Sequence, residues 1–180
     1  MNASPVRVFI ALELPAELKA ALTELIRTWQ AQLTTKQAQK AVRWVQPEKM
    51  HLTLRFLGEI APTSLPPLAE ALHKAIAPFA PFALTVQGSG AFPNERRIRV
   101  LWAGCEATPP LIALQHAIEG VVRTQGYPGE NRAFSAHLTL GRVNDVASET
   151  AIHAIAELVA NAQVGTLGTI PVESLSLIHI

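Results

Sequence analysis

The tetrapeptide His-Leu-Thr-Leu occurs twice in the sequence, at His51–Leu54 and at His137–Leu140, and each copy lies in an apolar run typical of a β-strand. Side chains at positions i and i+2 of a strand share a face, so each copy presents an imidazole beside a hydroxyl and turns its leucines toward a core. If the two strands face one another across a pseudo-twofold axis, these groups meet in one cleft, and such a set suits acid–base chemistry on a phosphodiester. The candidate catalytic residues are therefore His51, Thr53, His137 and Thr139.

A pair of histidines can supply an acid and a base together, because the imidazole has a reference pKa of about 6.5. On a cyclic phosphodiester, the neutral histidine would take a proton from water while the charged one gave a proton to the departing ribose oxygen. In the reverse direction, a hydroxyl would attack a cyclic phosphate and form a phosphodiester. Thr53 and Thr139 would donate hydrogen bonds to the non-bridging oxygens, where charge develops in the transition state. Nothing in this scheme requires a metal or another cofactor.

The composition limits the class of protein. With 180 residues, 49% apolar and 16% charged, the chain can build one generous core or two small fused lobes and is not disordered. A net charge of +1 gives no indication of nucleic-acid binding, which would have to depend on local clusters of positive charge. Cys105 is the only cysteine, which excludes an internal disulfide and a zinc site with paired thiolates. The sequence shows no signal peptide and no apolar run of membrane-spanning length, so we expect a cytoplasmic location without a membrane partner. We also expect a monomer.

A repeat of predicted elements surrounds the two tetrapeptides. Hydrophobic spacing and the breakers proline and glycine predict strands and helices in the first half at 6–12, 16–32, 42–45, 50–57, 65–77 and 82–87. The second half repeats the order at 98–103, 111–125, 136–143, 148–160 and 172–178. We therefore predict an α+β fold, a single bilobal domain over 1–180 with pseudo-symmetric β-α-β-β-α-β lobes at about 6–87 and 98–178. Antiparallel-rich sheets would flank a central cleft, and residues 88–95 would link the lobes.

Several segments together resemble a known family. Besides the two tetrapeptides, they are the opening Arg7–Pro15, the stretch Arg43–Val45 followed by Pro47, and the run Arg99–Gly104. They are similar, over nearly the whole chain, to the 2H phosphoesterase superfamily and within it to the bacterial RNA 2',3'-cyclic phosphodiesterases, also called 2'-5' RNA ligases. The resemblance implies a bilobal fold and metal-independent hydrolysis of 2',3'-cyclic phosphate RNA ends to 2'-phosphomonoesters, with a weaker RNA-joining activity. It also implies that His51 is the proton donor and His137 the proton acceptor.

The sequence departs from this family at its C-terminal end. Members usually continue beyond the strand that starts here at Val172, with a further polar turn and strand, whereas this sequence ends at Ile180. The resemblance therefore leads us to expect an incomplete C-terminal lobe.

Three residues are candidates for substrate binding. Arg55 continues the alternation of the first motif and would hold a phosphate in the cleft, or else lie solvated at its rim. Arg142 has the opposite parity to His137, and a bulge at Gly141 would turn it inward. Phe9, Trp44 and Phe134 are candidates to stack on a terminal base; core packing is the favoured role for each, and Phe9 is the preferred stacking candidate among them. Phe56 has the parity of the leucines and is assigned to the core.

Other observations leave the substrate open. The basic group Arg96, Arg97 and Arg99 could follow an RNA backbone or form a solvated strand edge. A second enzymatic interpretation keeps the mechanism but acts on a small cyclic nucleotide, such as a cyclic phosphate of ADP-ribose. In a third interpretation, the protein is a non-catalytic module that binds RNA ends and uses its histidines only to recognise phosphate.

Overall fold

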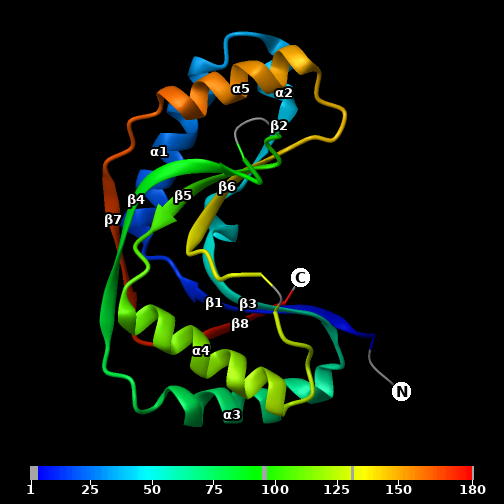
Figure 1. The fold of residues 1–180 in the computed structure, drawn as a ribbon, viewed down its shortest axis with the longest axis vertical. Helices are drawn as coiled ribbons and strands as arrows, with labels where there is room; N and C mark the ends of the chain where they lie inside the picture. Colours follow the sequence, from blue (N-terminus) through cyan, green and yellow to red (C-terminus); the bar gives the residue numbers. More distant parts are fainter. Residues whose placement is uncertain (1–3, 95–96, 131, 180) are drawn as a thin grey trace.

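Two antiparallel sheets form the framework of the computed structural model, which describes residues 4–94, 97–130 and 132–179 (Figure 1). A three-stranded sheet has the order β3-β1-β8, and a five-stranded sheet has the order β2-β6-β5-β4-β7. The strands are β1 (Val6–Glu13), β2 (Val42–Trp44), β3 (His51–Ile60), β4 (Phe82–Phe92), β5 (Val100–Cys105), β6 (His137–Val143), β7 (Thr166–Val172) and β8 (Ser176–His179). The helices are α1 (Ala16–Gln32), α2 (Lys36–Ala41), α3 (Leu65–Ile76), α4 (Pro109–Thr124) and α5 (Glu149–Asn161), with 3-10 turns at Pro47–Lys49 and Pro62–Ser64.

The α+β class and the antiparallel sheets are as predicted, but the lobes are not the two halves of the chain. The small sheet takes β8 from the second half, and the large sheet takes β2 and β4 from the first. The helices are exchanged in the same way: α4 packs against α3 and β3, whereas α1 packs against β7 and α5 against α2 and β4 (Figure 1). A boundary between 6–87 and 98–178 therefore does not separate the sheets, because hydrophobic spacing predicts elements and not the sheet that each one joins.

Two predicted boundaries are wrong. β4 continues to Phe92, so residues 88–92 belong to a strand and not to a linker. Its register against β5 shifts between Val86 and Ser89, and Gly88 in between has a φ of +71°, a conformation that glycine adopts without strain. The first residue of the predicted linker, Gly88, therefore lies in a bulge of β4. The predicted last strand at 172–178 is in fact two strands, since β7 ends at Val172 and β8 begins at Ser176.

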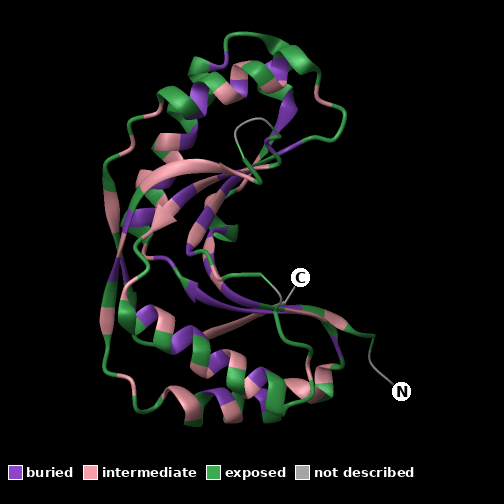
Figure 2. Cartoon of the chain, in the orientation of Figure 1, coloured by how far each residue is buried: buried purple, intermediate pink, exposed green. Residues whose placement is uncertain are grey.

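The core forms where the predicted periodicities are strongest. In α1, the buried residues Leu18, Leu22, Ile26 and Trp29 follow helical spacing along one stripe. In β1, residues 8–12 are all buried, so both faces of this central strand are covered (Figure 2). Helix α2 lies in a segment predicted as a loop, where the Thr35 side chain caps it by accepting a hydrogen bond from the Ala38 N–H. Among the described residues, no helix has the length and hydropathy that crossing a membrane would require.

Candidate active site

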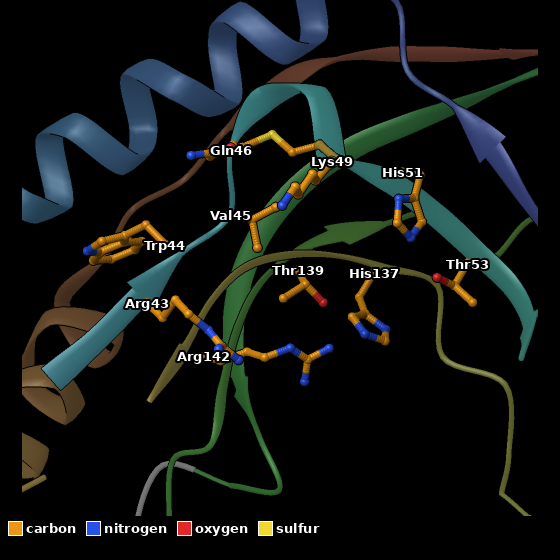
Figure 3. A pocket seen from close by; sticks show the side chains of 11 residues that line it. Arg43, Trp44, Val45, Gln46, Lys49, His51, Thr53, His137, Thr139 and Arg142 are labelled. Atoms are coloured by element: carbon orange, nitrogen blue, oxygen red, sulfur yellow. The ribbon is translucent and has the colours of Figure 1, made fainter. Parts of the chain in front are cut away.

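The two tetrapeptides open β3 and β6, which belong to different sheets and contact each other. Their leucines are buried as expected, with Leu52, Leu54, Leu138 and Leu140 at most 3% exposed. Their polar side chains line one cavity of about 500 Å³, which brings together His51, Thr53, His137 and Thr139 (Figure 3). The convergence expected from the spacing of the two motifs is therefore what the fold produces.

The environment of His51 is apolar on one side and basic on another. Its ring stacks on Phe9 with centroids 4.5 Å apart and planes inclined by 26°. Burial lowers the pKa of His51; a hydrogen bond with the Lys49 backbone opposes this, and the charge of Lys19 adds to the lowering. The neutral form of His51 is thus favoured when the cavity holds no anion.

His137 has a defined tautomer. Its Nδ1 lies 2.7 Å from the Ser135 carbonyl oxygen, which can only accept, so Nδ1 carries the hydrogen and donates it. In the neutral ring, Nε2 is then the basic nitrogen. Phe92 contacts the ring edge-on, with centroids 4.8 Å apart. His137 is therefore held with an acceptor nitrogen available for chemistry.

A bulge in β3 changes the role expected for Arg55. Thr53 pairs with Ala11 but Arg55 pairs with Ile10, so Leu54 is an extra residue and the alternation of faces is reversed beyond it. Arg55 is consequently only 7% exposed and turns into the protein, where its Nε lies 2.7 Å from Glu119 Oε2. The expectation that Arg55 faces the cavity beside the histidines is therefore wrong, since its side chain lines an adjoining cavity instead, and its binding of a phosphate stays a prediction.

Arg55 instead joins three parts of the structure. Its guanidinium donates to the carbonyl oxygens of Phe56 and Pro128 as well as to Glu119. Burial alone would raise the pKa of Glu119, but the hydrogen bond from the Glu130 N–H and the charge of Arg55 outweigh it and hold that pKa below its ordinary value. The buried Arg55 and the partly exposed Glu119 thus join β3 to α4 and to the loop that precedes β6.

The same bulge exposes Phe56, which was expected in the core. Phe56 is 41% exposed, and the Arg7 guanidinium lies 4.9 Å from the centre of its ring. Phe56 lines a second cavity of about 420 Å³ together with Phe92 and Phe134, and this cavity shares Thr53 and His137 with the first. Sequence reasoning missed Phe56 because alternation was extended through a residue that breaks it.

An equivalent bulge in β6 turns Arg142 toward the site. Thr139 pairs with Trp102 and Gly141 with Leu101, so Leu140 is the extra residue. Arg142 then lines the cavity beside Thr139, as the predicted bulge near Gly141 required. A glycine is needed there because a Cβ would lie 2.6 Å from Val42 Cγ1. The signal for both Phe56 and Arg142 was present in the repeat, since each lies five residues after its histidine.

The other predicted contacts have mixed outcomes. Phe9 is 4% exposed, stacks on His51 and lines neither cavity, which supports its packing role, while its stacking on a base stays a prediction. Trp44 lines the first cavity, with the two histidines, and Phe134 lines the second one. Arg99 forms an exposed ion pair with Asp145 and lines neither cavity, while Arg96 lies outside the described residues. Within the described parts of the chain, no cluster of histidine, cysteine and acidic residues suits a metal ion.

Comparisons with known proteins agree with this geometry. Residues 16–102 match the family described as LigT like Phosphoesterase. An RNA 2',3'-cyclic phosphodiesterase of Methanothermobacter thermautotrophicus is 31% identical over 96% of this chain and 88% of its own. The crystal structure of TT0787 of Thermus thermophilus aligns with a TM-score of 0.73 and 29% identity over 95% of this chain and 86% of its own. Escherichia coli LigT complexed with 3'-AMP aligns with a TM-score of 0.68 and 28% identity, over 97% and 88%.

Proposed function

We propose that this chain, which belongs to the LigT-like phosphoesterase family, hydrolyses RNA 2',3'-cyclic phosphate ends to 2'-phosphomonoesters with its two histidines as acid and base. One observation carries the proposal: two His-Thr pairs from different sheets line a single cavity together with Arg142. The relative of Methanothermobacter, a cyclic phosphodiesterase by name, supplies the class of substrate.

The reaction assigns one proton transfer to each histidine. His137 Nε2 takes a proton from a water molecule as its oxygen attacks phosphorus and forms the new P–O bond. The bond from phosphorus to the ribose 3' oxygen breaks, and His51 gives its proton to that oxygen, which leaves the 2'-phosphate. The fixed tautomer of His137 supports its role as the base. A proton exchange with water then restores both rings.

The lowered pKa of His51 is compatible with its role as the acid. A lower pKa makes the imidazolium a better donor toward the leaving oxygen, but it also leaves less of the protonated form in the free enzyme. An anionic phosphate in the cavity favours the charged ring, since opposite charges within a few ångströms raise the pKa of a histidine. Substrate binding and protonation of His51 are therefore coupled.

The remaining cavity residues bind and stabilise. Thr53 and Thr139 donate hydrogen bonds to the non-bridging oxygens, and Arg142 neutralises the charge that grows there in the transition state. Phe56, exposed at the adjoining aromatic cavity, offers a ring face for the terminal base. The same pair of histidines working in reverse gives 2'-5' joining, in which an RNA hydroxyl replaces water.

Turnover of 2',3'-cyclic AMP tests the proposal, with phosphorus NMR used to identify the product. The expected product is 2'-AMP, formed at the same rate with and without EDTA. A predominant 3'-phosphate would mean that the histidine roles are exchanged, and a rate lost to EDTA and restored by a divalent ion would contradict metal independence. If nucleotide binds without turnover, the protein is a binding module.

A further inference from the structure

We propose that Arg43 and Lys49 form a second phosphate subsite within the catalytic cavity, which takes an RNA phosphate other than the one that reacts. The proposal rests on the proposed function, because the cyclic phosphate must lie between the histidines for a second phosphate to reach these residues. The shared ligand chemistry is an RNA phosphodiester or phosphomonoester. Its source is the 5' side of the terminal nucleotide or a second strand that takes part in joining.

The charge of the cavity exceeds what the reaction needs. Its described lining includes Arg43, Lys49 and Arg142 and no carboxylate. A cyclic phosphodiester carries one negative charge, and Arg142 beside Thr139 is placed to meet it together with a protonated histidine. Arg43 and Lys49 therefore add two positive charges that the reacting phosphate leaves uncompensated, although the whole chain carries a net charge of only +1.

The strand register forces two of these cations together. Arg43 on β2 is the direct partner of Arg142 on β6, and like charges at directly opposed positions destabilise a sheet. Among the residues that the structure describes, neither arginine has an ion pair with a carboxylate, whereas Arg55 pairs with Glu119 and Arg99 with Asp145. An anion between or beside Arg43 and Arg142 would relieve this repulsion.

The subsite has a defined place relative to the chemistry. Trp44, Val45 and Gln46 continue the cavity wall from Arg43 toward Lys49, which ends the 3-10 turn before His51 (Figure 3). The second cavity, which Phe56, Phe92 and Phe134 line, adjoins the catalytic cavity, because the two share Thr53 and His137. The second cavity has three phenylalanines, which suit a base, and its charged lining residues are of both signs, Arg55 and Arg132 with Glu130. The described lining of the catalytic cavity has cations alone, which suit a phosphate.

The experiment compares paired substrates that differ by one phosphate. In the first arm, kcat/KM is measured for 2',3'-cyclic AMP and for its 5'-phosphorylated form. In the second arm, cleavage is measured for the 2'-5' dinucleotide ApA with and without a 3'-phosphate on its leaving nucleoside. We expect an enhancement of about tenfold in at least one arm, the scale of a charge-assisted contact. The arm that shows it identifies the source of the phosphate.

Substitutions then test whether the enhancement depends on Arg43 and Lys49. Arg43→Gln should bring the ratio of the paired substrates close to one, and Lys49→Gln should lower it less. Arg27→Gln is the matched control, because it removes one positive charge from an exposed position on α1 where Arg27 pairs with Glu24, and its ratio should equal that of the wild type. A ratio near one in both arms for the wild type, or a ratio unchanged in Arg43→Gln, would overturn the subsite. Failure of the wild type to hydrolyse 2',3'-cyclic AMP would instead overturn the proposed function.

Discussion

The two motif strands share a backbone device but present different side chains. In β3 and in β6, the second leucine of the motif is the bulged residue. The residue two positions beyond it is exposed and faces outward from the core. That residue is Phe56 in β3 and Arg142 in β6. One backbone plan thus supplies an aromatic ring on one side of the reacting centre and a cation on the other, which suits a substrate that has a base on one side and a phosphate on the other.

The residue directly after the bulged leucine differs between the two strands, and the structure explains the difference. In β3 it is Arg55, which is buried against Glu119 and fastens the strand to α4. In β6 it is Gly141, which lets β2 approach so closely that a Cβ would strike Val42. The long side chain of Arg55 thus anchors β3, whereas the missing side chain of Gly141 lets β2 pack closely against β6.

The largest effect is expected where the two strands are alike. His51→Ala and His137→Ala should each lower kcat by about 100-fold or more, because each removes one proton transfer. The losses should not multiply in the double variant, since the residues act as a unit. Steady-state hydrolysis of 2',3'-cyclic AMP measures this, with thermal melting as the control for folding. Near-normal activity of either single variant would contradict a mechanism in which both histidines transfer protons.

The outer residues should give smaller and separable effects. Arg142→Gln should lower kcat/KM by about 10- to 100-fold on any substrate, because a charge-assisted contact to phosphate is lost. Phe56→Ala should cost about tenfold, and only on substrates that have a base. Ribose 2',3'-cyclic phosphate, which lacks the base, separates the two: Arg142→Gln stays defective on it, and Phe56→Ala matches the wild type. If both variants lost the same activity on the substrate without a base, Arg142 and Phe56 would not have the separate roles of binding phosphate and base.

The positions after the bulges should differ in stability. Arg55→Ala should lower the free energy of unfolding by about 1.5–3 kcal/mol, because it removes charge-assisted hydrogen bonds between the buried guanidinium and the partly exposed Glu119. Gly141→Ala should cost about 1–3 kcal/mol through overpacking against Val42 and Trp44. Urea denaturation measures both. If Gly141→Ala were neutral, the close approach of β2 would not depend on the glycine.

The pH profile should respond to the apolar contact of His51. The alkaline limb of kcat/KM reports the acid of the free enzyme, and burial lowers the pKa of His51. Phe9→Ala admits water to the ring and raises that pKa, so the alkaline limb should move to higher pH. Phe79→Ala, which removes a ring that lines neither site cavity, should leave the profile unchanged. Movement of the acidic limb in Phe9→Ala would assign His51 as the base.

The sequence predicted those features that depend on local pattern. Strand alternation placed His51, Thr53, His137 and Thr139 on polar faces, and the repeat predicted that the two faces meet. It failed where one backbone residue changes the pattern, since the bulge at Leu54 reversed the faces of Arg55 and Phe56. At Gly141 the glycine itself signalled the bulge, whereas at Leu54 only the repeat could have done so, because Phe56 and Arg142 both lie five residues after a motif histidine. The exchange of helices between the sheets was also hidden, because it depends on contacts between distant parts of the chain.

In the proposed reaction, His51 protonates the leaving 3' oxygen while His137 activates water. A cyclic substrate with sulfur in place of the 3' oxygen tests it most directly, because a thiolate, with a pKa of about 8.5 as the thiol, leaves without protonation. We expect this substrate to reduce the defect of His51→Ala by at least about tenfold and to leave that of His137→Ala unchanged. Rescue of His137→Ala instead, or an equal defect of His51→Ala on both substrates, would contradict it.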